Sequence, residues 1–182
     1  TASNNTAVGS DALKANTTGT QNVAVGSRAG DAITTGSENT AIGHASLTNA
    51  TTASDNTGVG RATLNQNTSG VSNTAVGHDA LENNTTASNN TAVGKDALTN
   101  NTTGGTNVAV GSLCMDANTE GQNNVAVGVH ALGGNTTADD NTAIGHNALK
   151  ENTTGVNNTA IGSLALDANT TANNNTAVGT TA

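Results

Sequence analysis

A five-residue segment, NTAVG at residues 5–9, returns along the whole chain at one fixed spacing. Its glycine recurs every 17 residues, eleven times, without an insertion or a deletion. A short fixed period is typical of repeat architectures in which each coil buries its apolar side chains only against its neighbours. Residues 1–182 are therefore predicted to form one repeat array, whose coils begin at Asn5, Asn22, Asn39, Asn56, Asn73, Asn90, Asn107, Asn124, Asn141, Asn158 and Asn175.

The composition argues against an ordinary globular core. Phe, Tyr, Trp and Pro are absent, so the large side chains that usually fill a core are missing. Charged residues make up 10% of the chain and the net charge is −8, which gives no basic surface for nucleic acid. No apolar run is long enough to span a membrane. A thin core of small side chains, one layer wide, is compatible with all of these observations.

The first half of each coil reads as a short strand. We number the coil from its asparagine, so that Asn5 is position 1 and Gly9 is position 5. Position 2 is Thr or Val, position 3 is Ala except at Gly58, and position 4 is always Val or Ile. A β-branched, small, β-branched order predicts a strand with period two. The glycine that follows suits a sharp corner.

The second half of each coil carries Leu at position 9 and Asn-Thr-Thr at positions 12–14. Position 13 is Thr in all ten complete coils, whereas position 14 is once Ser69 and once Glu120. A solitary Glu is costly to bury, so position 14 is expected to face water. Strand alternation then turns the position-13 Thr inward, with its hydroxyl bonded to backbone or to the next Thr. This pattern predicts two short strands and two or three turns per coil.

The predicted fold is all-β: a parallel β-solenoid, or β-roll, of eleven 17-residue coils with short strands and tight Gly or Asn corners. Coils about 4.8 Å apart would make a rod on the order of 50 Å long. Side chains 17 residues apart are expected to stack in columns, and stacked Asn amides to form hydrogen-bonded ladders. The columns include Asn5, Asn22, Asn39 and Asn90; Val8, Val25, Ile42 and Val93; Gly9, Gly26, Gly43 and Gly94; Leu13, Leu47, Leu81 and Leu98; and Thr17, Thr34, Thr51 and Thr102.

The exchange of Thr and Val at position 2 leaves two arrangements open. Either positions 2 and 4 fill the solenoid interior together with the Leu column, or Ala lines a narrow interior and the Val/Thr face packs on neighbouring chains. In the second case an exposed Val/Ile stripe on the order of 50 Å long would be an interaction patch.

The chain offers no arrangement that predicts catalysis, a cofactor or a metal site. Nucleophilic catalysis needs Ser or Cys beside His and an orienting acid, and the polar residues here are scattered along the coil edges. His44 and His78 share position 6 but lie two coils apart, too far for one zinc ion, and are expected to face solvent. Asp139, Asp140 and Asp55 follow no repeated calcium-binding pattern. Cys114 and Met115 replace the usual Ala and Leu and are interpreted as packing residues.

Several segments resemble the head repeats of YadA-like trimeric autotransporter adhesins and the Asn-Thr-Ala-Val-Gly arrays of phage tail-fibre-like proteins. The segments are residues 22–26, 107–111 and 124–128 (NVAVG), with 39–43 and 158–162 (NTAIG) as variants. The resemblance implies a parallel β-roll, trimeric association and adhesion to a surface or host, and no catalytic residues. The coil is longer than in that pattern, and its Asn-Thr-Thr half has no counterpart in it.

These observations lead us to expect a non-enzymatic structural or adhesive module of an extracellular fibre, a surface adhesin or a phage tail-fibre-like assembly. The expected partners are copies of the chain, as a homotrimer or an end-to-end fibre, and a host surface or extracellular-matrix ligand. The array is expected to be a segment of a longer fibre. The alternative is an ice-binding solenoid with a flat, Thr-rich face.

Overall fold

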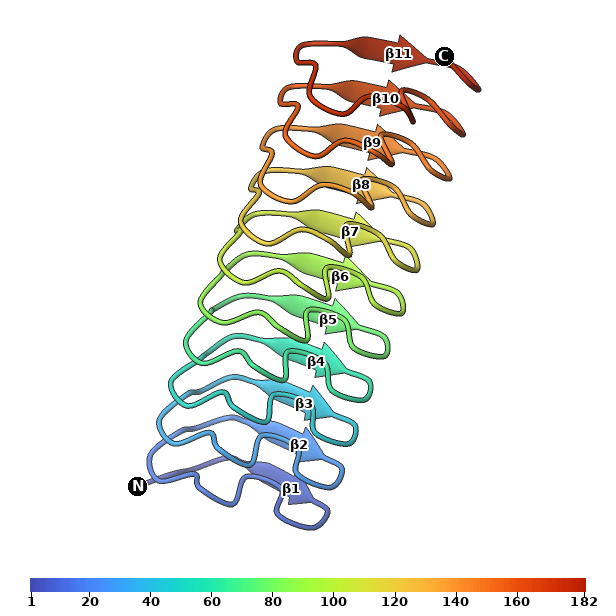
Figure 1. The fold of residues 1–182 in the computed structure, drawn as a ribbon. Coiled ribbons are helices and arrows are strands. Elements are labelled where there is room, and N and C mark those ends of the chain that lie inside the picture. Colours follow the sequence, from blue (N-terminus) through green and yellow to red (C-terminus); the bar gives the residue numbers. More distant parts are fainter.

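The computed structural model describes residues 1–182 and confirms the predicted all-β parallel solenoid (Figure 1). One sheet contains every strand in chain order, and the chain forms no helix long and apolar enough to cross a membrane. The strands are β1 (Thr6–Val8), β2 (Val23–Val25), β3 (Thr40–Ile42), β4 (Thr57–Val59), β5 (Thr74–Val76), β6 (Thr91–Val93), β7 (Val108–Val110), β8 (Val125–Val127), β9 (Thr142–Ile144), β10 (Thr159–Ile161) and β11 (Thr176–Val178).

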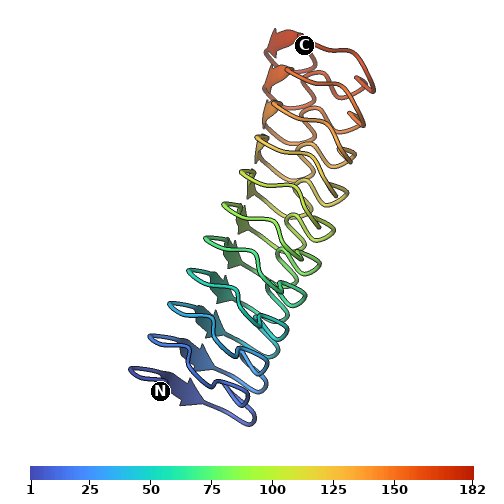
Figure 2. The ribbon, with the colours of Figure 1, turned by 90° about the vertical axis from the view of Figure 1, so that its left-hand side faces the viewer.

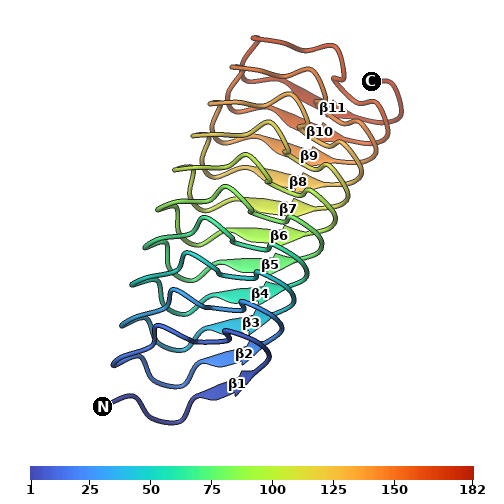
Figure 3. The same ribbon diagram turned by 60° about the horizontal axis from the view of Figure 1, so that its bottom comes forward.

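Equivalent residues of successive coils pair directly. Val8 pairs with Val25, Val25 with Ile42, and the same register holds in every neighbouring pair up to β10 and β11. The strands therefore line one side of the stack and the turns form the other sides, as Figures 2 and 3 show from two further directions. A stack without any offset is what a 17-residue period without insertions requires.

Each coil contains one strand, so the prediction of two is wrong. The Asn-Thr-Thr half runs parallel to its copies and hydrogen-bonds to them, yet it forms bends rather than a strand. Positions 7, 9 and 17 all have positive φ, as at Asp96 (57°), Leu98 (51°) and Asn89 (62°). These left-handed residues make the sharp turns on either side of the Asn-Thr-Thr half, which itself has no positive φ.

The core consists of Ala and Leu columns. Position 3 points inward, as in Ala24, Ala92 and Ala126, and meets the Ala of position 8 and the Leu of position 9 from the opposite side of the coil. Positions 2 and 4 consequently point out of the solenoid. Of the two arrangements left open by the sequence, the one in which positions 2 and 4 fill the interior is wrong, and Ala lines a narrow interior instead.

Two glycines depart from the repeat, and larger side chains nearby fill the space that each of them leaves. Gly58 replaces the usual Ala at position 3, where a Cβ would lie 2.6 Å from Ser46 Oγ and 2.8 Å from Thr63 Oγ1. Those two hydroxyls stand in position 8, where Ala is usual, and lie 2.8 Å apart. Likewise Gly30 replaces the position-9 Leu, and Ile33 at position 12 fills the space that this Leu would occupy.

Replacing Gly94 with Val should destabilise the coils on both sides of it. Gly94 has a φ of 140°, and a Cβ there would lie 2.4 Å from the carbonyl oxygen of Gly111 in the next coil. Backbone strain together with overpacking should lower the free energy of unfolding by about 3 kcal/mol, as measured by urea denaturation. Gly133→Ala is the matched control, since its Cβ would have no contact below 3.3 Å. Equal stability of the two variants would contradict the corner assignment.

The compensation around Gly58 can be measured by a mutant cycle. Gly58→Ala alone should cost roughly 1–3 kcal/mol of stability, because its methyl group meets two hydroxyls. Adding Ser46→Ala and Thr63→Ala should recover most of that loss, because it recreates the all-Ala packing of the other coils. Additive effects of the three substitutions in thermal unfolding would argue against coupling.

Candidate functional site

The outward side chains of the strands form a uniform surface along the molecule. We define the strand face as positions 2 and 4 of β1 to β11. The position-4 residues of β2, β3, β5 and β7 to β10 are 36–40% exposed, although all are Val or Ile. Position 2 is half-buried in the same strands, and no coil has a charged residue at positions 1 to 5. The strand face is thus an uncharged, aliphatic and Thr-containing strip along the rod.

The position-1 asparagines hold the edge of this face in place. In each of the ten steps the backbone N–H of one Asn donates to the side-chain oxygen of the Asn one coil before it, at 2.8–3.1 Å. The side-chain amide also donates to the carbonyl at position 15 of its own coil, as from Asn90 to Gly104 at 3.0 Å. The column is buried from Asn22 to Asn158, so each bond replaces one to water.

A second amide ladder runs along position 12 and was not identified from the sequence. Asn84 donates to the side-chain oxygen of Asn67 at 2.9 Å, Asn101 to that of Asn84 at 3.1 Å, and the ladder continues to Asn169. Its amides donate to the same position-15 carbonyls, so Gly104 accepts from both Asn90 and Asn101. The sequence feature that could have predicted this ladder is the Asn at position 12, which is present in every complete coil except the two that carry Ile33 and Ala50 there.

The ladder breaks where its sequence breaks. Ile33 and Ala50 have no amide, so the buried side-chain oxygen of Asn16 has no hydrogen-bond partner. An unpaired buried carbonyl carries the cost of its lost hydration. The coils around residues 16–50 therefore depend on apolar contacts where the later coils have hydrogen bonds.

The position-13 threonines form a third ladder. From Thr17 to Thr153, each hydroxyl donates to the backbone carbonyl of the equivalent Thr one coil further on, at 2.9–3.4 Å, as from Thr102 to Thr119 at 3.0 Å. The expected bond to backbone is present, but the expectation that these Thr residues turn inward is wrong. Thr17 and Thr51 are exposed and Thr34 and Thr102 are half-buried, because Asn and not Thr occupies the inward place in this bend.

The remaining predicted columns lie on different sides of the coil. The leucines named above stack inside the rod, with Leu47, Leu81 and Leu98 fully buried. The position-5 glycines stack at the corner after the strand, and the position-4 residues stand outside it. The structure therefore brings the Asn, Leu and Ala columns together in the interior and leaves the Val/Ile column without a partner.

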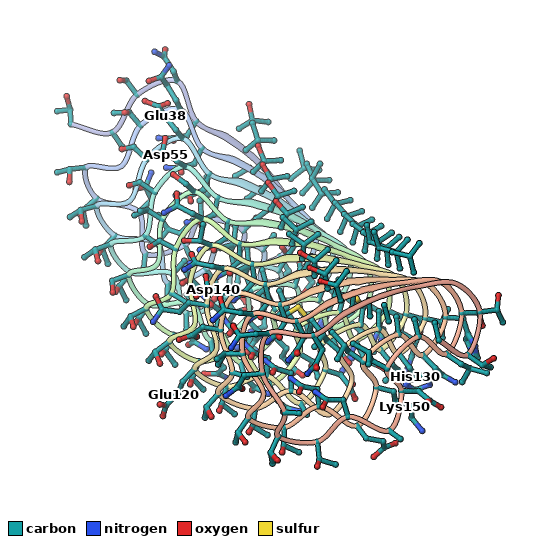
Figure 4. All side chains as sticks on the ribbon, turned by 90° about the horizontal axis from the view of Figure 1, so that it is seen from above. Glu38, Asp55, Glu120, His130, Asp140 and Lys150 are labelled. Carbon is teal, nitrogen blue, oxygen red and sulfur yellow. The ribbon has the colours of Figure 1, made fainter.

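Charged side chains lie on the turns, away from the strand face. In Figure 4, which looks along the stack, Glu38, Asp55 and Asp140 stand at one end of the coil and His130 at the other, with Glu120 on a third side. The histidines of position 6 are exposed.

Ligand-type atoms of His78, Asp79 and Asp96 lie within 4.8 Å of one another, a group that the sequence did not suggest. Arg61 approaches His78 and Asp79 at 3.0 and 3.3 Å, and Lys95 pairs with Asp96, so cationic side chains already balance these acids.

Cys114 is buried in the core, as expected for a packing residue. Its Sγ lies 3.2 Å from the carbonyl oxygen of Ala126. Burial raises the pKa of the thiol to about 12, so it stays protonated at neutral pH. Burial also raises the pKa of Glu82, helped by the nearby Asp79 carboxylate.

The structure contains no pocket. Comparison with known proteins finds no matching family model, no matching curated sequence and no matching solved structure.

Replacing Asn90 with Ala should destabilise the array by about 2–4 kcal/mol. The substitution removes the acceptor of the Asn107 N–H and one of the two donors to the Gly104 carbonyl, and leaves a small cavity. Chemical denaturation measures the loss. Asn83→Ala is the control, because position 11 is half-exposed and is Ala in other coils. A loss no larger than that of the control would mean that the ladder does not stabilise the stack.

Proposed function

We propose that this chain is a non-catalytic structural and adhesive repeat module that packs with other chains through its strand face. The proposed setting is an extracellular fibre, a cell-surface adhesin or a phage tail-fibre-like assembly. In such a setting the array acts as a stiff spacer. Copies of the chain are the first proposed partner, and a host surface or matrix ligand is the second.

The observation that carries this proposal is the unpartnered aliphatic column at position 4. Single exposed apolar residues are common on protein surfaces, but a continuous apolar strip with polar borders is typical of an interaction site. Here Val or Ile is repeated in all eleven strands, flanked by Thr or Val, and charges are confined to the turns. Association of strand faces would remove this strip from water and so stabilise an assembly.

The sequence resemblance supports the same proposal. The NVAVG segments at residues 22–26, 107–111 and 124–128 are the ones that resemble YadA-like head repeats, and they contribute Val at both outward positions of β2, β7 and β8. These are the most apolar strands of the strand face. We propose trimeric or fibrous association on this ground.

Val76→Asp tests the proposal. Val76 is 37% exposed on the strand face, so a carboxylate should weaken self-association at least about tenfold while leaving stability within about 1 kcal/mol. Sedimentation velocity and mass photometry measure the assembly, and urea denaturation the fold. Thr86→Asp is the control, because position 14 is exposed on another side of the coil and already accepts Glu120. A wild-type chain that stays monomeric up to high micromolar concentration would refute the proposal.

Ice binding is a second candidate, favoured by one specific observation. Both outward positions of each strand lie on the same face in parallel register, and position 2 is Thr except at Val23, Val108 and Val125. A regular array of Thr and aliphatic side chains is the kind of surface that this function needs. Thermal hysteresis and ice shaping by a monomeric chain would support ice binding over the packing role, and their absence would remove it.

A further inference from the structure

We infer that β7 and β8 form the centre of the self-association surface, where they contact β7 and β8 of a second copy of this chain. This inference rests on the proposed packing role of the strand face, and it adds the segment that dominates the contact and the register of the partner. It follows from the distribution of Val, Thr and charged residues along the rod.

Two neighbouring strands have Val at both outward positions. Val108 of β7 pairs with Val125 of β8, and Val110 pairs with Val127, so four Val side chains adjoin one another on the strand face. Val110 and Val127 are each 36% exposed. β2 also has two outward Val residues, but its neighbours β1 and β3 have Thr at position 2. No other two successive strands both lack Thr at this position.

Val129 extends this group of side chains beyond the corner that follows β8. It occupies position 6, where the other coils have Ser, Thr, His, Lys or Arg, and it is 43% exposed. We define the aliphatic cluster as Val108, Val110, Val125, Val127 and Val129.

Charged side chains border this cluster without entering it. Residues 97–115 and 121–138, which include both strands and the residues on either side of them, contain no Asp, Glu, Lys or Arg. Along the two borders of the face, charges return one coil away, with Lys and Asp at residues 95–96 after β6 and two Asp at residues 139–140 before β9. An apolar centre inside a polar rim is typical of a protein–protein interface.

The dimensions of the strand face favour a second copy as the occupant. Five residues across and eleven coils along give a strip of roughly 13 Å by 50 Å, or about 650 Å². That approaches the roughly 800 Å² that each partner contributes to a standard stable interface. A partner has to be equally long and regular to cover this strip, as another copy of the chain is (Figure 1).

The aliphatic cluster alone is too small to hold a stable complex. Two coils of the strand face give roughly 120 Å², far below the area of a standard interface. The cluster therefore acts as the centre of a longer contact and not as a separate site for a short segment of another protein.

The register follows from the same distribution of residues. Contact between the two equivalent clusters removes the most apolar part of both copies from water. A shift of the partner by two coils would instead place the cluster against β5 and β6 or against β9 and β10, which have Thr at position 2. The borders of these strands include Lys95 and Asp140, whose burial against Val would be unfavourable.

Val127→Asp and Val25→Asp form a matched pair of variants that tests where the centre lies. Both residues are the second Val of an NVAVG segment, and both are 36% exposed. A carboxylate at the centre of the contact should raise the dissociation constant at least about tenfold more at Val127 than at Val25, which lies near the end of the strip. Sedimentation velocity measures the association, and urea denaturation checks each fold.

Val129→Ser tests the part of the cluster beyond the corner. Ser occupies position 6 in four other coils, so the variant should keep the fold. Loss of the apolar side chain should weaken association about fivefold. Val71→Ser is the control, because it makes the same change at a 38% exposed residue outside the cluster and should alter association less than about twofold.

Mixing two charge variants tests the register. Chains with Val127→Asp and chains with Val127→Lys should each associate weakly alone, whereas an equimolar mixture should regain association, because opposite charges then lie at the same height of the contact. A mixture of Val25→Asp chains with Val127→Lys chains should show no such gain.

Equal weakening by Val127→Asp and Val25→Asp would overturn the inference and leave the packing role of the strand face intact. The same holds if mixing the two Val127 variants restores no association. A wild-type chain that stays monomeric would instead overturn both the inference and the packing role.

Discussion

The hydrogen bond between the side-chain amide of one asparagine and the backbone of the next coil is the interaction on which the rest of the structure depends. At position 1 the amide accepts from the coil above it and donates across its own coil, so both of its functions are satisfied in the interior. These bonds form only when successive coils are in register. A core of Ala and Leu alone would not discriminate between registers so sharply, because small apolar side chains can slide past one another.

The fold could be predicted because the constant 17-residue spacing determines which residues of successive coils lie next to each other. The spacing of the position-5 glycines and the period-two order of positions 2 to 4 were sufficient to place all eleven strands. The second half of the coil could not be predicted in the same way. Leu98 has positive φ, which is unfavourable for its residue type, and only its burial against Ala and Leu compensates. Local sequence preference does not reveal that burial of this side chain offsets its unfavourable backbone conformation.

The strand face was predicted as one of two possibilities, for a physical reason. Thr and Val have similar shapes, so their exchange at position 2 fits both a packed interior and a covered exterior. The structure shows that Ala at position 3 lines the interior, so positions 2 and 4 face outward.

The absence of any offset between coils has a consequence for how the length of such a chain can vary. Deletion of one residue would shift every later residue into the wrong column. Deletion of 17 residues would remove one coil and leave every column continuous. Unequal recombination between near-identical repeats produces changes of the second kind. The length of the rod can therefore change in steps of one whole coil while the arrangement of its surface residues stays the same.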